Sequence, residues 1–256
     1  MPYVNVENKK NYTIITLNHA KSLNAITTPM LEEIADNLDK LSKSDKISCV
    51  ILTGSNTFFS AGVDVEERKK QDFLSLMTED KRFELWKKIA NFDKPLIAAV
   101  SGYAVGPGFE LVSLCDIVIA GDTTKFAVPE VTLASLPESG LVRRLITVCG
   151  KAKAMEIMLT GRNIDALEAE KMGVISRIVP NDYVLKDAME VAARISEQSA
   201  VIIKMFKKAA KNAVDMGASE SMEAERLLFK AALGTEDAKE GINAFIEKRK
   251  AKFQNK

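Results

Sequence analysis

The sequence has little of what many catalytic and metal sites are built from. Its 256 residues include one histidine, His19, and three cysteines that lie far apart in the chain. No Cys-x-x-Cys pair or Cys/His cluster is present, so the pattern predicts no metal site and no disulfide framework. A Ser/His/Asp triad would have to use His19 itself, and no Gly-x-Ser-x-Gly motif supports one. Both kinds of chemistry are therefore disfavoured.

Excess charge of one sign and long hydrophobic runs are absent as well. Lys plus Arg number 36 against 35 Asp plus Glu, so the chain has no overall electrostatic attraction to nucleic acid or to an anionic membrane. No apolar run approaches the ~18 residues that a membrane-spanning helix needs, and the N-terminus lacks the hydrophobic stretch of a signal peptide. We therefore expect a cytoplasmic protein, with an organellar matrix as the alternative, and neither a membrane nor a nucleic acid as its partner.

Apolar residues make up 46% of the chain, which is enough to bury a sizeable core. Strands are predicted where β-branched and apolar residues cluster, at residues 4–7, 12–17, 47–53, 95–100 and 117–120. Helical spacing marks residues 29–41 and 83–89, between those strands. This alternation is typical of a mainly parallel sheet with helices packed on it.

Most segments after residue 151 have helical spacing instead. Asp165 and Glu168 resemble a capping box that opens a helix. Further helical stretches are predicted at residues 184–197, 200–214, 221–232 and 240–253. We therefore divide the chain into a core, residues 1–195, and a C-terminal helical region, residues 196–256.

A glycine-rich turn, V-G-P-G-F-E-L from Val105 to Leu111, follows the predicted strand at residues 95–100. A strand, a glycine turn and a helix start form a general anion site, because the first helical N–H groups lack intrahelical partners. The spacing is neither Gly-x-Gly-x-x-Gly nor a phosphate loop, however, so nucleotide binding is disfavoured. Taken alone, the turn also fits a structural role in which Glu110 stabilises a helix N-terminus.

Several further motifs change that interpretation. F-F-S-A-G-V-D, at residues 58–64, is a second glycine-containing turn after a strand, and F-A-V-P-E, at residues 126–130, adds another carboxylate. Together with G-Y-A-V-G-P-G-F-E-L, M-L-T-G-R and the C-terminal A-F-I-E-K-R-K-A-K-F, they make the chain resemble the crotonase superfamily of enoyl-CoA hydratases and isomerases. The resemblance implies an α/β fold: a crotonase-like spiral of ββα units with a C-terminal helical trimerisation region, in a homotrimer or a homohexamer of two trimers.

In that family two backbone N–H groups stabilise the enolate oxygen of a thioester. By resemblance, one donor of this oxyanion hole is Ala61, and the other lies three residues before the glutamate, at Pro107. Proline has no backbone N–H. The resemblance therefore leaves three alternatives open: Gly108 supplies its N–H, a water molecule substitutes, or the site is weakened.

The two glutamates of the family's hydratases are present. By resemblance, Glu110 orients and deprotonates the water that is added to the α,β double bond, and Glu130 protonates the α carbon. Paired carboxylates in a partly apolar cleft raise at least one pKa, which keeps a proton available near neutral pH. Glu138, in L-P-E-S-G, stands where some family isomerases have a catalytic acid, so it is a candidate extra acid or base. A solvated loop charge is the alternative interpretation of Glu138.

Contacts to coenzyme A are implied for three parts of the chain. The candidate CoA- or substrate-binding residues are Lys21, Ser22, Leu23, Ala25, Gly62, Val63, Asp64, Lys248 and Phe253. The last two would reach a ligand of the same or of a neighbouring subunit. The C-terminal lysines around Lys248 also fit a solvated helix face or, as a remote alternative, an RNA-binding patch.

The resemblance therefore implies an enzyme of fatty acid metabolism that reversibly adds water to a 2-enoyl-CoA thioester. One alternative is isomerisation of an enoyl-CoA or dienoyl-CoA through Glu130 or Glu138. Others are a carnitinyl-CoA dehydratase-like activity, and an acyl-CoA binder whose catalysis is weak because of Pro107. In each case we expect no metal and no redox cofactor, the acyl-CoA thioester itself being the substrate.

Overall fold

The computed structural model describes residues 2–256, apart from the side chain of Ser75. Its strands are β1 (Val4–Asn8), β2 (Tyr12–Leu17), β3 (Cys49–Thr53), β4 (Phe58–Ser60), β5 (Leu96–Val100), β6 (Tyr103–Val105), β7 (Ile117–Gly121), β8 (Lys125–Ala127), β9 (Ile164–Asp165) and β10 (Arg177–Val179). Its helices are η1 (Ala20–Ser22), α1 (Thr28–Ser42), α2 (Val65–Lys69), α3 (Phe73–Thr78), α4 (Lys81–Ala90), α5 (Pro107–Ser113), η2 (Pro129–Leu133), α6 (Leu141–Thr160), α7 (Ala166–Lys171), η3 (Asn181–Tyr183), α8 (Val184–Ile195), α9 (Ala200–Asp215), α10 (Ala218–Leu233) and α11 (Glu236–Ile246).

The larger of two sheets has the strand order β1-β2-β3-β5-β7-β10, and only the β1–β2 pair is antiparallel. Its central strands β3 and β5 are buried along their whole length. That burial explains their continuous apolar sequences, because both faces of a parallel sheet are covered by helices. The mainly parallel α/β architecture expected from the sequence is confirmed.

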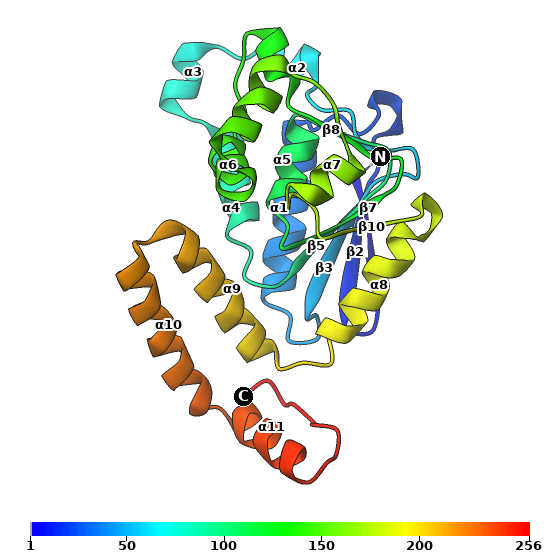
Figure 1. The fold of residues 1–256 in the computed structure, drawn as a ribbon. Helices are drawn as coiled ribbons and strands as arrows, with labels where there is room; N and C mark the ends of the chain where they lie inside the picture. The colour runs from blue at the N-terminus through cyan, green and yellow to red at the C-terminus, as the bar shows by residue number, and fades with distance from the viewer. Residues whose placement is uncertain (1) are drawn as a thin grey trace.

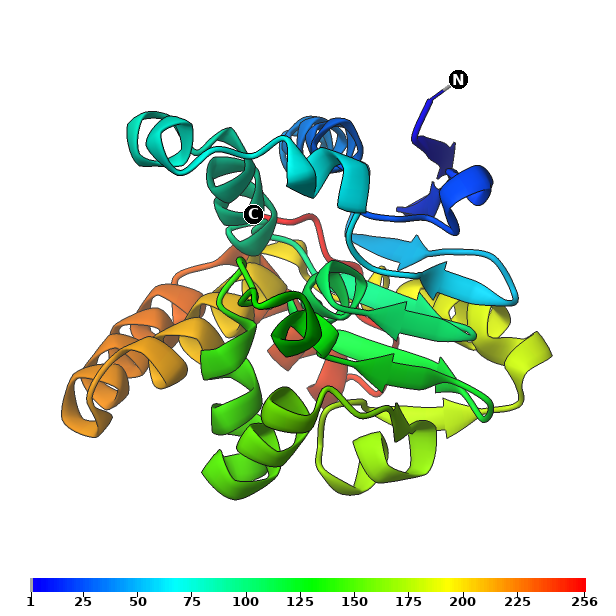
Figure 2. The same cartoon turned by 90° about the horizontal axis from the view of Figure 1, so that it is seen from above.

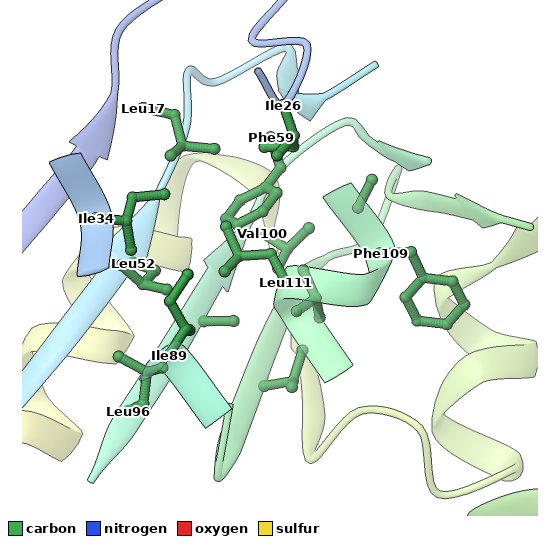
Figure 3. Packing of buried hydrophobic residues seen from close by; sticks show 14 of the residues in the cluster. Leu17, Ile26, Ile34, Leu52, Phe59, Ile89, Leu96, Val100, Phe109 and Leu111 are labelled. Atoms are coloured by element: carbon green, nitrogen blue, oxygen red, sulfur yellow. The ribbon is translucent and has the colours of Figure 1, made fainter. Parts of the chain in front are cut away.

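Two hydrophobic clusters, one on each face, hold the large sheet in place. Helix α8 packs Val184, Ala188 and Ala192 on one face (Figure 1). The other face contacts α1, α4, α5 and the second sheet. Figure 3 shows Phe59 of β4 beside Val100 of β5 and Leu111 of α5 in that cluster. The second sheet is thus fixed to the first by a continuous apolar core.

The second sheet has four short strands in the order β4-β6-β8-β9. β4 and β6 are parallel, as are β6 and β8, whereas β9 runs antiparallel. The carboxyl ends of β4, β6 and β8 therefore meet at one edge. The segment after β4, the helix α5 after β6 and the helix η2 after β8 all begin there.

The helices after α8 form an arm that extends away from both sheets (Figures 1 and 2). Helices α9 and α10 pack against each other, and α9 is tied to the core by ion pairs such as Lys207 with Asp116, 2.7 Å. The large apolar side chains that the arm exposes include Phe206, Met222, Leu227, Phe229, Phe245 and Ile246. Within residues 2–256, no helix is both long and apolar enough to cross a bilayer.

Two sequence expectations differ from the structure. The last helix ends at Ile246, so the basic residues after it lie on a turn and a non-helical tail and not on a helix face. Asp165 does cap α7, since its Oδ1 accepts from Glu168 N–H at 2.8 Å. The carboxylate of Glu168, however, pairs with Arg162 and so does not complete a capping box. Charge pairing outcompetes the local motif at that position.

A buried lysine closes the C-terminal end of α1. Lys94, 4% exposed, donates from Nζ to the carbonyl oxygens of Leu41, Ser44 and Ile47 at 2.6, 2.6 and 2.9 Å. Replacing it by methionine keeps the apolar stem and leaves these carbonyls without their donor. We expect Lys94→Met to lower the free energy of unfolding by about 1–3 kcal/mol, as measured by urea denaturation.

The exposed neighbour Lys46 provides a matched control. Lys46→Met should change the free energy of unfolding by less than about 0.5 kcal/mol. Equal effects of the two substitutions would show that the carbonyl contacts of Lys94 contribute nothing.

Candidate active site

The carboxyl-terminal edge of β4, β6 and β8 brings together the residues that the sequence singled out. Helix α5 begins at that edge with Gly106 as its N-cap, at φ 48° and ψ −121°. This left-handed backbone favours glycine. A Cβ on Gly106 would also lie 2.9 Å from Glu130 Oε1. The turn that starts α5 therefore packs directly against the second carboxylate.

Glu110 is fully buried in α5, and its two carboxylate oxygens differ in their hydrogen bonds. Oε2 accepts hydrogen bonds from the backbone N–H groups of Glu138 and Ser139, at 3.0 and 2.5 Å. Arg144 holds the same loop by donating to the carbonyl and the hydroxyl of Ser139. Oε1 has no hydrogen-bond partner among the described residues. Burial raises the pKa of Glu110, and the bonds to Ser139 lower it in part.

Glu130, in η2, is 6% exposed, and neither of its carboxylate oxygens has a hydrogen-bond partner within the described chain. Burial raises its pKa to about 7, and the nearby charge of Glu110 adds to the shift. The two carboxylates therefore interact electrostatically. That Glu110 and Glu130 act together on one substrate stays a prediction of the sequence.

The backbone donor near β4 is not the one that the sequence indicated. Ala61 N–H donates to the carbonyl of Leu23 at 2.9 Å, so it is already engaged. Ile26 N–H donates to Gly62 O at 2.8 Å, in a parallel bridge between Ile26 and Val63. Because C=O and N–H of one trans peptide point in opposite directions, Val63 N–H points away from Ile26. No described residue accepts a hydrogen bond from it.

Val63 thus replaces Ala61 as the candidate oxyanion donor. Gly62 lies against the carbonyl of Val105, because a Cβ there would be 3.1 Å from that oxygen. Val105 in turn leads into the Gly106 turn and α5. The segment that carries Val63 is therefore packed beside the turn that starts α5.

The second expected donor position is Pro107, the first residue of α5, and it offers no N–H. Glu110 N–H is used within the helix, since it donates to Gly106 O at 2.8 Å. Gly108 N–H belongs to the first turn and has no acceptor in the part of the chain that the structure describes. A Cβ on Gly108 would lie 2.6 Å from Ser60 Cβ, so only glycine lets α5 approach β4 this closely. Gly108 is the available donor nearest to Pro107.

Glu138 is neither a free acid nor a solvated loop charge. Its Oε1 accepts from Arg82 Nε at 2.5 Å and from Trp86 Nε1 at 3.0 Å, and Oε2 lies 3.5 Å from Arg68 Nη2. The Glu138 side chain is 19% exposed and that of Arg82 6%. The carboxylate is therefore committed to an ion pair, and its backbone N–H to Glu110. Its solvated-loop interpretation is wrong, and its role as a catalytic acid stays a prediction that this geometry disfavours.

The predicted CoA loop lies beside the predicted thioester segment. Lys21 and Ser22 belong to η1, and Leu23, half exposed at φ 51°, is the acceptor of Ala61 N–H. Asn24 and Ala25 continue the loop into the buried core. The side chain of Asp64 caps α2, with Oδ1 accepting from Glu67 N–H at 2.9 Å. Asp64 is thus committed to the helix, while its neighbours Gly62 and Val63 line the site through their backbone.

The structure does not bring Lys248 and Phe253 to this site within one chain. Both lie beyond α11, at the end of the molecule opposite α2 and α3 (Figure 1). Phe253 lines an apolar hollow of about 480 Å³ between α9 and α11, where its ring packs on Gly241. Much of the basic cluster is also neutralised, because Arg249 pairs with Glu240 at 2.6 Å and Lys250 with Glu197 at 3.0 Å.

Comparison with known proteins shows which enzyme family has this fold. The fold and the paired glutamates beside backbone donors define an α/β enzyme of the crotonase type. The chain belongs to the enoyl-CoA hydratase/isomerase family, whose model matches residues 7–256.

A probable enoyl-CoA hydratase of Mycobacterium bovis is 43% identical over 251 residues, 98% of this chain and 97% of the relative. A probable mitochondrial enoyl-CoA hydratase of Dictyostelium discoideum is 40% identical, over 98% of this chain and 90% of the relative. The crystal structure of an enoyl-CoA hydratase subunit from Geobacillus kaustophilus superposes with a TM-score of 0.96 at 35% identity, covering 99% and 98% of the two chains. The family resemblance, the fold and an enzyme of this type are thereby confirmed.

Sequence reasoning missed the charged side chains around Glu138. Arg82 and Trp86 lie on α4, which the periodicity did predict, but Arg68 lies on α2, which appeared in the sequence only as a charged segment. An arginine four residues before a tryptophan, on one face of the predicted helix, was the available signal. It gave no indication of which carboxylate would pair with the arginine.

The Glu138 network leads to a stability prediction. Removing one partner of a buried ion pair leaves the other charge uncompensated, at a cost of about 3–5 kcal/mol. Because Glu138 is partly exposed, we expect Glu138→Ala to lower the free energy of unfolding by about 3 kcal/mol in urea denaturation, and Glu138→Gln by less.

Glu84 on α4 serves as the control, since its pair with Lys87 is exposed. Glu84→Ala should cost less than about 0.5 kcal/mol. A Glu138→Ala protein as stable as Glu84→Ala would contradict the buried pairing.

Proposed function

We propose that this chain is an enoyl-CoA hydratase that reversibly adds water across the double bond of a 2-enoyl-CoA thioester. The observation that carries the proposal is the pair of buried glutamates with unpartnered oxygens, Glu110 Oε1 and both oxygens of Glu130. Such oxygens are costly in a folded protein unless a ligand or water uses them. The relatives named as enoyl-CoA hydratases support the same reaction.

The surroundings of the two glutamates support different roles. Two N–H donors on Oε2 favour the ionised form of Glu110, so Glu110 acts as the base that takes a proton from water. Glu130 has no donor and a pKa near 7, so it carries the proton that is delivered to the α carbon. Hydration then transfers the hydroxyl from water to the β carbon and the Glu130 proton to the α carbon. The proton on Glu110 returns to solvent or to Glu130.

Main-chain donors stabilise the charge that develops on the thioester oxygen. Val63 N–H supplies one hydrogen bond, and Gly108 N–H supplies the other from one residue beyond Pro107. One such donor is worth about 2.7–4 kcal/mol in measured enzymes. Since Gly108 stands one position further into the helix than the usual donor, this second hydrogen bond is the weaker part of the site.

The competing functions have less support. Isomerisation through Glu138 would need a free acid, whereas Glu138 is paired with Arg82 and Trp86. The same pairing argues against a carnitinyl-CoA dehydratase-like use of that carboxylate. An acyl-CoA binder with weak catalysis is motivated by Pro107 alone. Loss of the conjugated thioester absorbance of crotonyl-CoA supports hydration, and binding without any loss supports the binder.

The remaining features complete the proposal. The reaction uses acid–base chemistry only, so it needs no metal or redox cofactor, and it suits fatty acid β-oxidation in the cytoplasm or an organellar matrix. The apolar surface of α9–α11 supports assembly into a homotrimer, or a homohexamer of two trimers. In such an assembly Lys248 and Phe253 serve the coenzyme A site of a neighbouring subunit.

The roles of the glutamates predict the pH dependence of activity. In the hydration direction Glu130 must be protonated, so kcat/KM should fall as the pH rises through about 7. Glu130→Gln cannot deliver a proton and should lower kcat by about 10²–10⁴-fold. Crotonyl-CoA hydration measured from pH 5 to 9 tests both. A wild-type profile that stays flat above pH 7 would exclude Glu130 as the acid.

The oxyanion hole predicts a gain of function. Pro107→Gly adds an N–H at the first position of α5, and we expect kcat/KM to rise about tenfold or more. The glycine also increases the freedom of the unfolded chain, at a cost of about 0.5–1 kcal/mol in stability. Crotonyl-CoA kinetics and urea denaturation measure the two effects. Unchanged kinetics would mean that Gly108 fully replaces the missing donor.

A further inference from the structure

The segment that leads from β4 to Val63 is held by a loop from a distant part of the sequence. This loop, residues 19–26, lies between β2 and α1. Two backbone hydrogen bonds join it to the segment: Ala61 N–H donates to Leu23 O at 2.9 Å, and Ile26 N–H donates to Gly62 O at 2.8 Å. The position of the Val63 N–H therefore depends on the conformation of the loop.

Asn24 adds a third bond between the loop and the segment through its side chain. Its Nδ2 donates to Phe59 O at 3.2 Å, and its Oδ1 accepts from His19 N–H at 2.7 Å. Asn24 is 1% exposed, so water cannot replace these bonds if they are lost. The Asn24 amide thus fastens the start of the loop to its end and ties both to β4.

The backbone of the loop is unusual at the same place. Leu23 and Asn24 have φ angles of 51° and 56°, in the left-handed region that few residues other than glycine adopt. Asparagine tolerates this region better than most residues, whereas leucine does not. Such a conformation persists only where the surrounding contacts fix it. The buried bonds of Asn24 are contacts of that kind, and they hold Leu23 O in place for Ala61 N–H.

The hydrogen bonds of the segment leave the Val63 N–H available. Ala61 N–H donates to Leu23, and Gly62 N–H donates to Ser60 Oγ at 3.2 Å. A donor to an oxyanion must be in place before the charge develops, because the stabilisation comes from preorganisation. Resting on the hydratase function proposed above, we propose that Asn24 is a positioning residue that fixes the Val63 N–H for the thioester oxygen.

Asn24→Gly tests this role, because glycine removes both side-chain bonds and adopts a positive φ without strain. Complete removal of one oxyanion donor costs about 10²–10³-fold in kcat. Displacement of the donor should cost less, so we expect kcat for crotonyl-CoA to fall about 10- to 100-fold. KM should stay close to the wild-type value, because the lost interaction is made mainly in the transition state.

Asn24→Asp is the second variant and provides the test if the glycine variant does not fold. It keeps the size of the side chain and the acceptor for His19 N–H, and its ionised carboxylate cannot donate to Phe59 O. We expect the same loss of kcat at an unchanged KM. Wild-type kcat in a folded Asn24 variant would overturn the positioning role.

Asn181 is the matched control, because its Nδ2 also donates to a backbone carbonyl, that of Asn56 at 2.9 Å. Asn56 lies in the connection before β4, at the opposite end of the strand from Val63. Asn181→Gly should leave kcat and KM unchanged. An equal loss of kcat in Asn24→Gly and Asn181→Gly would show a general effect of loosening β4, and it would overturn the specific role of Asn24.

A chromophoric thioester separates this inference from the proposed function. In 4-dimethylaminocinnamoyl-CoA, hydrogen bonds to the thioester oxygen polarise the conjugated system and shift its absorbance to longer wavelength. At saturation we expect a full shift with the wild-type protein and with Asn181→Gly, and a smaller shift with Asn24→Gly.

That pattern would support the positioning role even if crotonyl-CoA were not hydrated, which would overturn only the hydratase assignment. Equal shifts in the wild-type protein and Asn24→Gly, alongside normal hydration by both, would overturn the positioning role and leave the hydratase assignment standing.

Discussion

The alignment of three short parallel strands, β4, β6 and β8, is the constraint on which the rest of the structure depends. Because parallel strands end at the same edge, three segments from distant parts of the sequence begin side by side. They supply a backbone donor at Val63, the helix that carries Glu110, and the turn that carries Glu130. The apolar cluster between the two sheets keeps that edge fixed, since Phe59, Val100 and Leu111 pack into one core (Figure 3).

The different roles proposed for Glu110 and Glu130 follow from the different surroundings of their carboxylates. Both glutamates are buried, and burial raises the pKa of each. Only Glu110 is compensated, by two N–H groups from a loop that Arg82 and Arg144 both bind. This loop therefore links stability to function: the side chain of Glu138 anchors it, and its backbone fixes the orientation of Glu110. The difference between base and acid originates in those hydrogen bonds and not in the residue types.

Pro107 is the unusual residue of the site. Pro107 suits the start of a helix, because the missing N–H would lack an intrahelical partner there anyway. It also withholds that N–H from the thioester oxygen.

The sequence by itself determined the alternating strands and helices, the family resemblance, and the choice of Glu110 and Glu130 as candidates, because periodicity and local motifs record those features directly. It did not determine which backbone N–H is free to bind an oxyanion. Ala61 and Val63 are both apolar residues of one short motif, and only the orientation of their peptides relative to Leu23 and Ile26 distinguishes them. Nor did it determine the partners of Glu138, which come from α2 and α4, more than fifty residues earlier. Tertiary structure decided these points, since hydrogen bonds and ion pairs depend on which surfaces the core brings into contact.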